Sequence, residues 1–180
     1  MKTMNSEQSI AVILGSAFEG SFAEGLKLVE EKVQTQFGDI TLYRSALRKD
    51  RVAYVIFRHG LPHSLLPNQI NYRAQASALK KVHCGALLIN SSVGVMDANL
   101  PIYKPMLVSD LMMPENRLPD GSTCTMFPEP SEEQGHLLIK DGLFSSSLND
   151  WLITQYRSEI HNAEDGVVFV YAGGPRGKTP

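Results

Sequence analysis

The 180-residue chain is predicted to be an α/β protein built on a mixed sheet, and three observations support this. Short apolar runs typical of buried strands alternate with segments of helical periodicity. Two strand-like runs flank the charged residues 48–51, which indicates an antiparallel hairpin within the sheet. Glycine, serine or arginine follows directly after the apolar runs, a composition typical of the ligand-binding ends of parallel strands.

The first half of the chain predicts three strands and a helix. Residues 9–15 are an apolar run ending in glycine and predict a buried strand that enters a turn. Residues 18–32 place large apolar side chains on one helical face and predict a short helix. Residues 40–47 and 52–57 are the two arms of the expected hairpin.

The rest of the chain continues the alternation. Residues 68–82 repeat apolar side chains every four positions and carry two lysines in the last turn, so they predict a helix. The continuous apolar run 86–89 predicts a fully buried strand, and 106–108 predicts another after two prolines. Residues 148–160 are expected to form a helix, and residues 166–172 a last strand.

Composition limits the class of protein. A chain with 43% hydrophobic and 20% charged residues is expected to form one globular domain over residues 1–180. A net charge of -2 gives no reason to expect nucleic acid or a membrane as partner, and no apolar run has the length of a membrane span. The polar start lacks a signal-peptide pattern, so we expect a cytoplasmic protein with Cys84 and Cys124 as free thiols.

Polar residues gather where three of the apolar runs end. Ser16 follows the first, Arg58 and His59 follow the second, and Ser91 and Ser92 follow the third. An arginine, hydroxyl groups and exposed backbone N–H groups at one edge of a sheet would bind an oxyanion. The serines could equally cap turns or a helix, and His59 could be a hydrogen-bonded structural residue.

The histidines do not predict a metal centre. His59 and His63 are four residues apart, but Pro62 lies between them and no glutamate intervenes. No pair of aspartates is placed for acid–base catalysis either. We therefore expect neither a metal ligand set nor a general acid or base.

The segment from Arg58 to Gly94 carries a specific pattern. In chain order its residues are Arg58, His59, Gly60, His63, Pro67, Ile70, Asn71, Tyr72, Arg73, Ala74, Ser91, Ser92, Val93 and Gly94. In this order and spacing the chain resembles the nucleoside phosphorylase superfamily, in particular its trimeric purine nucleoside and methylthioadenosine phosphorylases. The resemblance implies a three-layer α/β sandwich around a mixed, partly barrel-like sheet.

The resemblance also implies an activity. In that family, phosphate attacks the anomeric carbon of a purine nucleoside and releases the base and a ribose 1-phosphate. Phosphate would be held by Ser16, Arg58, His59, Ser91 and the backbone of Ser92. No metal or cofactor is implied, inorganic phosphate being a co-substrate, and the expected assembly is a homotrimer.

The resemblance further implies that His63 contacts substrate, as an alternative to a role in ordering its own loop. Methylthioadenosine is one candidate nucleoside, and the base and sugar substituent stay open.

The chain also departs from the family pattern. Ala17 stands where the family usually has a second glycine, and Val95 where glycine or serine usually follows Gly94. Gly177 and Lys178 stand at the family's aromatic and acceptor positions. The family's carboxyl-terminal third has no counterpart before Pro180. The alternative expectation is therefore a truncated or degenerate, non-catalytic relative that binds an anion or a nucleotide. A nucleosidase that uses water is a third alternative, less suited to the cationic Arg58.

Overall fold

The computed structural model describes residues 8–18, 24–47, 51–113, 117, 121–123, 125–127, 129–130, 132, 142–161 and 166–171. The chain divides into two units, Met1–Val93 and Gly94–Pro180. The expectation of one domain over residues 1–180 stays a prediction. No described helix combines the length and the apolar composition that a membrane crossing requires.

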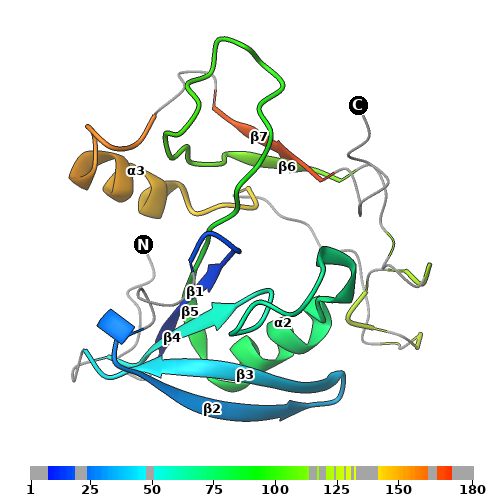
Figure 1. Ribbon diagram of the computed structural model, residues 1–180. Helices are drawn as coiled ribbons and strands as arrows, with labels where there is room; N and C mark the ends of the chain where they lie inside the picture. Colours follow the sequence, from blue (N-terminus) through cyan, green and yellow to red (C-terminus); the bar gives the residue numbers. More distant parts are fainter. Residues whose placement is uncertain are drawn as a thin grey trace. The chain divides into compact units, whose positions relative to one another are not determined.

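The first unit is built on a five-stranded sheet with the strand order β2-β3-β4-β1-β5 (Figure 1). Its strands are β1 (Ser9–Leu14), β2 (Leu28–Thr35), β3 (Gly38–Ser45), β4 (Ala53–Phe57) and β5 (Cys84–Ile89). The strand β1 pairs in parallel with both β4 and β5, whereas β2, β3 and β4 pair antiparallel. The predicted mixed α/β sheet is confirmed, and the described strands do not close into a barrel.

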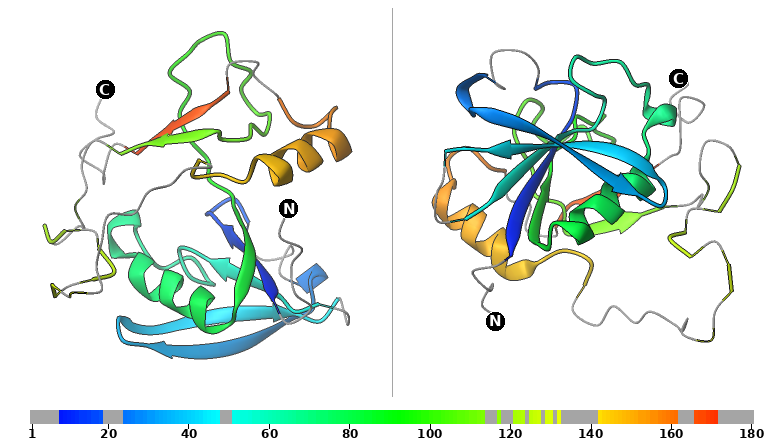
Figure 2. Two further views of the ribbon diagram at one scale, coloured as in Figure 1. Left: turned by 180° about the vertical axis from the view of Figure 1, so that it is seen from behind. Right: turned by 90° about the horizontal axis from the view of Figure 1, so that it is seen from below.

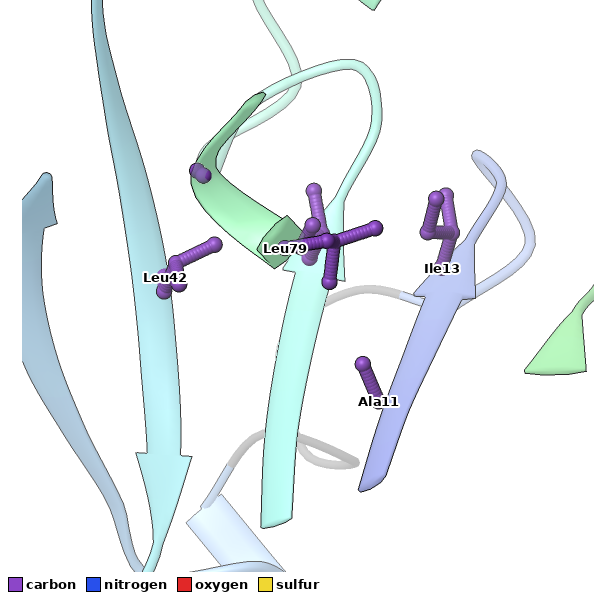
Figure 3. Packing of buried hydrophobic residues seen from close by; sticks show 6 residues of the cluster. Ala11, Ile13, Leu42 and Leu79 are labelled. Carbon is purple, nitrogen blue, oxygen red and sulfur yellow. The ribbon is translucent and has the colours of Figure 1, made fainter. Parts of the chain in front are cut away.

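One face of this sheet is covered by helix α2 (Tyr72–Lys81), which contacts β2, β3 and β5. Side chains alternate along β1, so Ala11 and Ile13 point to the α2 face. Figure 3 shows them beside Leu42 of β3 and Leu79 of α2. Burial of these apolar side chains joins the helix to the sheet.

The other face of the sheet holds a second apolar cluster, formed by Leu14, Val55 and Phe57. The rings of Tyr43 and Phe57 meet edge to face with centroids 5.3 Å apart. Because β1 and β4 are packed on both faces, they read in the sequence as continuous apolar runs.

Helix α2 begins after a short 3₁₀ turn, η1 (Pro67–Gln69). The Asn71 side-chain oxygen accepts a hydrogen bond from the Ala74 N–H at 3.0 Å and so caps the helix. The Asn71 amide group also donates to the Phe37 carbonyl at 2.6 Å, which ties the start of α2 to the turn between β2 and β3. The predicted helix over 68–82 is confirmed in its main part.

The helix expected over residues 18–32 is wrong from Leu28 onward. Strand β2 pairs with β3 along its whole length, from Leu28 opposite Ser45 to Thr35 opposite Gly38. Cross-strand pairing overrides the helical spacing of the apolar residues, and Gly38 supplies the positive φ of 111° at the tight turn. Residues 19–23 of that prediction lie outside the described part.

The strand expected at 86–89 is present, but the prediction that it is fully buried is wrong. In β5 the exposed fractions are 43% for Leu88 and 57% for Ile89. The reason is position, because β5 is the last strand in the order of the sheet and only β1 pairs with it among the described strands. In Figure 2, seen from behind, β5 runs beside α2 at this edge.

The second unit contains a parallel pair of strands, β6 (Asp110–Met112) and β7 (Val168–Val170), and a helix, α3 (Ser146–Gln155). The helix expected over 148–160 is present from Ser146 to Gln155, so its last five predicted residues are wrong, and the strand expected over 166–172 is confirmed for Val168–Val170. The strand expected at 106–108 is wrong, since Met106 forms one isolated bridge with His161 and the strand begins at Asp110. The two preceding prolines were a poor guide to the start of the strand, because pairing with β7 determines where β6 begins.

Candidate anion site at the strand ends

The carboxyl ends of three neighbouring strands lie side by side at one edge of the first unit's sheet. In the register of the sheet, Leu14 at the end of β1 is opposite Phe57 of β4, and Ile13 is opposite Ile89 of β5. The Arg58 N–H donates to the Leu14 carbonyl at 3.0 Å, which extends the ladder one residue past the end of β4. The three loops therefore leave the sheet together.

At this edge the Arg58 side chain spans from β4 across the end of β1 toward β5. Its Nη2 atom lies 3.0 Å from the point where a Cβ on Gly15 would stand. The same Nη2 donates a long hydrogen bond to the Ser91 hydroxyl oxygen at 3.4 Å. Arg58 and Ser91, which the sequence predicted for one site, are thus brought together.

Ser16 and Ser92 lie in the loops that flank this contact, and both are exposed. Ser16 follows Gly15 in a turn closed by the Phe18 N–H, which donates to the Gly15 carbonyl at 3.3 Å. Ser92 follows Ser91 after β5. The anion-binding role of both serines stays a prediction.

His59 is buried and has a defined hydrogen bond. Its Nδ1 lies 2.9 Å from the Leu65 carbonyl oxygen, and because a carbonyl only accepts, Nδ1 carries the proton. The ring of His63 lies 4.7 Å from that of His59, centroid to centroid. The hydrogen bond to Leu65 supports the structural role of His59. The contact of His59 with phosphate and that of His63 with substrate stay predictions.

The loop after β4 has a fixed shape. The His59 carbonyl accepts hydrogen bonds from the N–H groups of Ser64 and Leu65, both at 2.9 Å. Gly60 has a positive φ of 86°, and a Cβ there would stand 2.9 Å from the Ser64 hydroxyl oxygen, so this position needs glycine. These contacts fix the backbone at His59, the residue directly after Arg58.

Two contributors to this site were missed by sequence reasoning. The Leu65 carbonyl that orients His59 is a backbone group, so its residue type carries no signal. Gly15 was predicted to begin a turn before Ser16 at a strand end, but not to make the room that Arg58 occupies. Its position directly before Ser16, at the end of a central strand, was the signal available.

Several known proteins are similar to this chain. No model of a protein family matches the chain. A probable S-methyl-5'-thioinosine phosphorylase of Methanopyrus kandleri is 28% identical over 171 residues, which are 95% of this chain and 62% of that protein. A 6-oxopurine nucleoside phosphorylase of Pyrococcus furiosus is 34% identical over 96 residues, which are 53% of this chain and 34% of that protein.

Solved structures show the same fold. The methylthioadenosine phosphorylase from Schistosoma mansoni in complex with adenine matches 94% of this chain and 66% of its own, with a TM-score of 0.73 and 22% sequence identity. The chain thus spans less than two thirds of the length of this protein and of the Methanopyrus relative.

The fold is therefore that of an α/β phosphorylase, with polar strand ends gathered at one edge of a mixed sheet. The chain belongs to the nucleoside phosphorylase family.

Proposed function

We propose that the protein to which this chain belongs cleaves purine nucleosides with inorganic phosphate, releasing the base and a ribose 1-phosphate. The observation that carries the proposal is the contact of Arg58 with Ser91 across the end of β1. It gathers cationic and hydroxyl donors where parallel strands bind ligands. The names of the relatives support the purine class.

In this proposal the strand-end residues hold the nucleophile. The Arg58 guanidinium offers planar, permanently charged donors to phosphate oxygens, and Ser16, Ser91 and the Ser92 backbone add neutral ones. Since Ser91 accepts its hydrogen bond from Arg58, its own hydroxyl proton can donate to the anion. His59 stands next to Arg58 and His63 would contact the nucleoside.

The reaction needs little more from these residues than position. A phosphate oxygen forms a bond to the anomeric carbon as the bond to the base nitrogen breaks, and the base leaves with that electron pair and gains a proton. The ribosyl carbon carries positive charge as this bond stretches, as in other glycosyl transfers. An anion fixed beside it both stabilises that charge and is placed to attack. We propose no metal and no cofactor besides phosphate itself.

The relatives also suggest which nucleosides to test. They are named for methylthioinosine, 6-oxopurine nucleosides and methylthioadenosine, which differ at the purine six position and at the sugar five position. We propose a purine nucleoside substrate, with methylthioadenosine as the first candidate.

For the assembly we propose a homotrimer, or a multiple of it, in the cytoplasm. The family resemblance supports the trimer, and the cytoplasmic location stays a prediction. Light scattering coupled to size-exclusion chromatography tests the assembly, and a monomer at micromolar concentration would contradict it.

The test of the activity is base release from methylthioadenosine, inosine and adenosine with and without phosphate. We expect release only with phosphate, and Arg58→Ala should lower kcat/KM by about 10²–10³-fold, as for loss of one preorganised charge contact. Arg157→Ala, which removes an exposed arginine of the second unit, is the matched control and should change little.

Two other outcomes identify the alternatives. Phosphate binding in a calorimeter without turnover of any nucleoside would indicate a non-catalytic relative. Release of free ribose in the absence of phosphate would indicate a nucleosidase.

A further inference from the structure

Gly15 is a glycine for a reason other than its backbone conformation. Gly38 and Gly60 have positive φ angles that favour glycine, whereas the φ of Gly15 does not lie in that region. What a side chain at position 15 would meet is Arg58. An added Cβ would stand 3.0 Å from Nη2 and 3.9 Å from Cζ of that arginine.

The chain just after strand β5 also limits the space beside Gly15. The carbonyl oxygen of Asn90, the first residue after β5, lies 3.7 Å from the position of that Cβ. Gly15 is itself buried, so the guanidinium rests against the backbone at the end of β1. The bare backbone of Gly15 thus leaves the room in which Arg58 reaches Ser91.

We propose that Gly15 is a positioning residue for the anion site, which sets where Arg58 directs its donors. This inference rests on the proposed function, since it assumes that Arg58 binds inorganic phosphate. Charge-assisted bidentate hydrogen bonds depend on the orientation of the guanidinium plane. Displacing that plane lowers phosphate affinity although the arginine is still present.

The predicted effect on folding is different. The atom that a Cβ would meet is at the far end of a flexible side chain, which can move away without shifting the backbone. Gly15→Ala should therefore leave the unfolding midpoint of the phosphate-free chain within a degree or two. A loss of affinity without a loss of stability separates positioning from damage to the fold.

The experiment is calorimetric titration of the full chain with inorganic phosphate. We expect Gly15→Ala to weaken phosphate binding about tenfold or more. Gly25→Ala is the matched control, because no atom lies within 4 Å of its added Cβ and its φ is not positive, and it should bind like the unchanged chain.

A double-mutant cycle then assigns the effect to Arg58. Lysine has no guanidinium plane to be displaced, so on the Arg58→Lys background the Gly15→Ala change should cost less than twofold. An equal loss on both backgrounds would overturn the inference, because Gly15 would then act through its turn. Unchanged binding in Gly15→Ala, with binding lost in Arg58→Ala, would overturn it too but leave the proposed function standing. No phosphate binding by the unchanged chain would contradict the proposed function itself.

Discussion

The two units of the chain differ in the interactions that stabilise each of them internally. In the first unit, apolar side chains on both faces of β1 and β4 are buried in two clusters. In the second unit, none of the described residues is buried to that degree, and backbone hydrogen bonds join its segments. Examples are the Ser109 N–H to the Val167 carbonyl and the Tyr171 N–H to the Met112 carbonyl, both at 2.8 Å.

This difference shows where a binding site can be built with precision. Burial supplies most of the free energy of folding, whereas one backbone hydrogen bond contributes little net stability. The candidate anion site stands on the ends of β1, β4 and β5, two of which belong to the buried clusters. Rigid elements hold donors within the narrow tolerances that an oxyanion requires.

The largest expected effect comes from truncating matched leucines in the two units. Leu42 in β3 is 0% exposed and Leu143 in the second unit is 51% exposed. Leu42→Ala should lower the free energy of unfolding by about 2–5 kcal/mol, because a buried cavity remains. Leu143→Ala should cost under about 0.5 kcal/mol. Denaturant titration followed by circular dichroism measures both, and equal losses would contradict the comparison.

A smaller effect is expected from the helix caps. Asn71 caps α2, and the Ser145 hydroxyl caps α3 by accepting from the Leu148 N–H at 3.3 Å. Asn71→Ala also breaks the bond to the Phe37 carbonyl, so it should cost about 1–2 kcal/mol of global stability.

Ser145→Ala should instead loosen only its own helix, since α3 buries no residue. Hydrogen exchange resolves the two cases. Faster exchange of the β1 amides in Ser145→Ala would show that the units share one cooperative core.

The smallest expected effect is a dependence of stability on alkaline pH that belongs to the first unit. Burial, and then the nearby Glu31 carboxylate, raise the pKa of Tyr54, and burial followed by Glu30 raises the pKa of Tyr43. A raised pKa means that the folded chain keeps the phenol protons that the unfolded chain loses above about pH 10. The contribution of these two tyrosines to the free energy of unfolding is therefore complete below that pH. It is lost as the pH rises through their pKa values in the folded chain.

Unfolding at several pH values between 8 and 11.5, for the unchanged chain, Tyr54→Phe and Tyr43→Phe, tests this. Each variant should reduce the alkaline loss of stability, and Tyr103→Phe, whose side chain is fully exposed, supplies the background. If neither Tyr54→Phe nor Tyr43→Phe changes how steeply the free energy of unfolding falls with pH, the alkaline loss of stability belongs to other groups.

Sequence reasoning succeeded where burial on both faces leaves a continuous apolar run. Strands β1 and β4 and the polar residues after them were predicted for this reason, and so was the meeting of Arg58 with Ser91. It failed for β2, because the charged residues Glu30, Glu31 and Lys32 interrupt the apolar pattern expected of a strand. The pairing of β2 with β3 is also a non-local property, which the local sequence does not show. It also overestimated the burial of β5, because an apolar run does not reveal whether its strand has one neighbour or two.

The site could be predicted only in part, for a related reason. Residue types at strand ends indicate chemistry, and the register of the sheet decides which ends meet. The room at Gly15 and the carbonyl of Leu65 arise from backbone geometry, which the sequence does not display.

The hydrogen bond between His59 and the Leu65 carbonyl has a spectroscopic consequence. It holds the proton of the neutral ring on Nδ1, whereas an imidazole in water exchanges between both tautomers. The two ring nitrogens of His59 should therefore give widely separated ¹⁵N resonances. Those signals come from the residue next to Arg58, so a titration of the ¹⁵N-labelled chain with phosphate can be followed at the strand ends without any substitution.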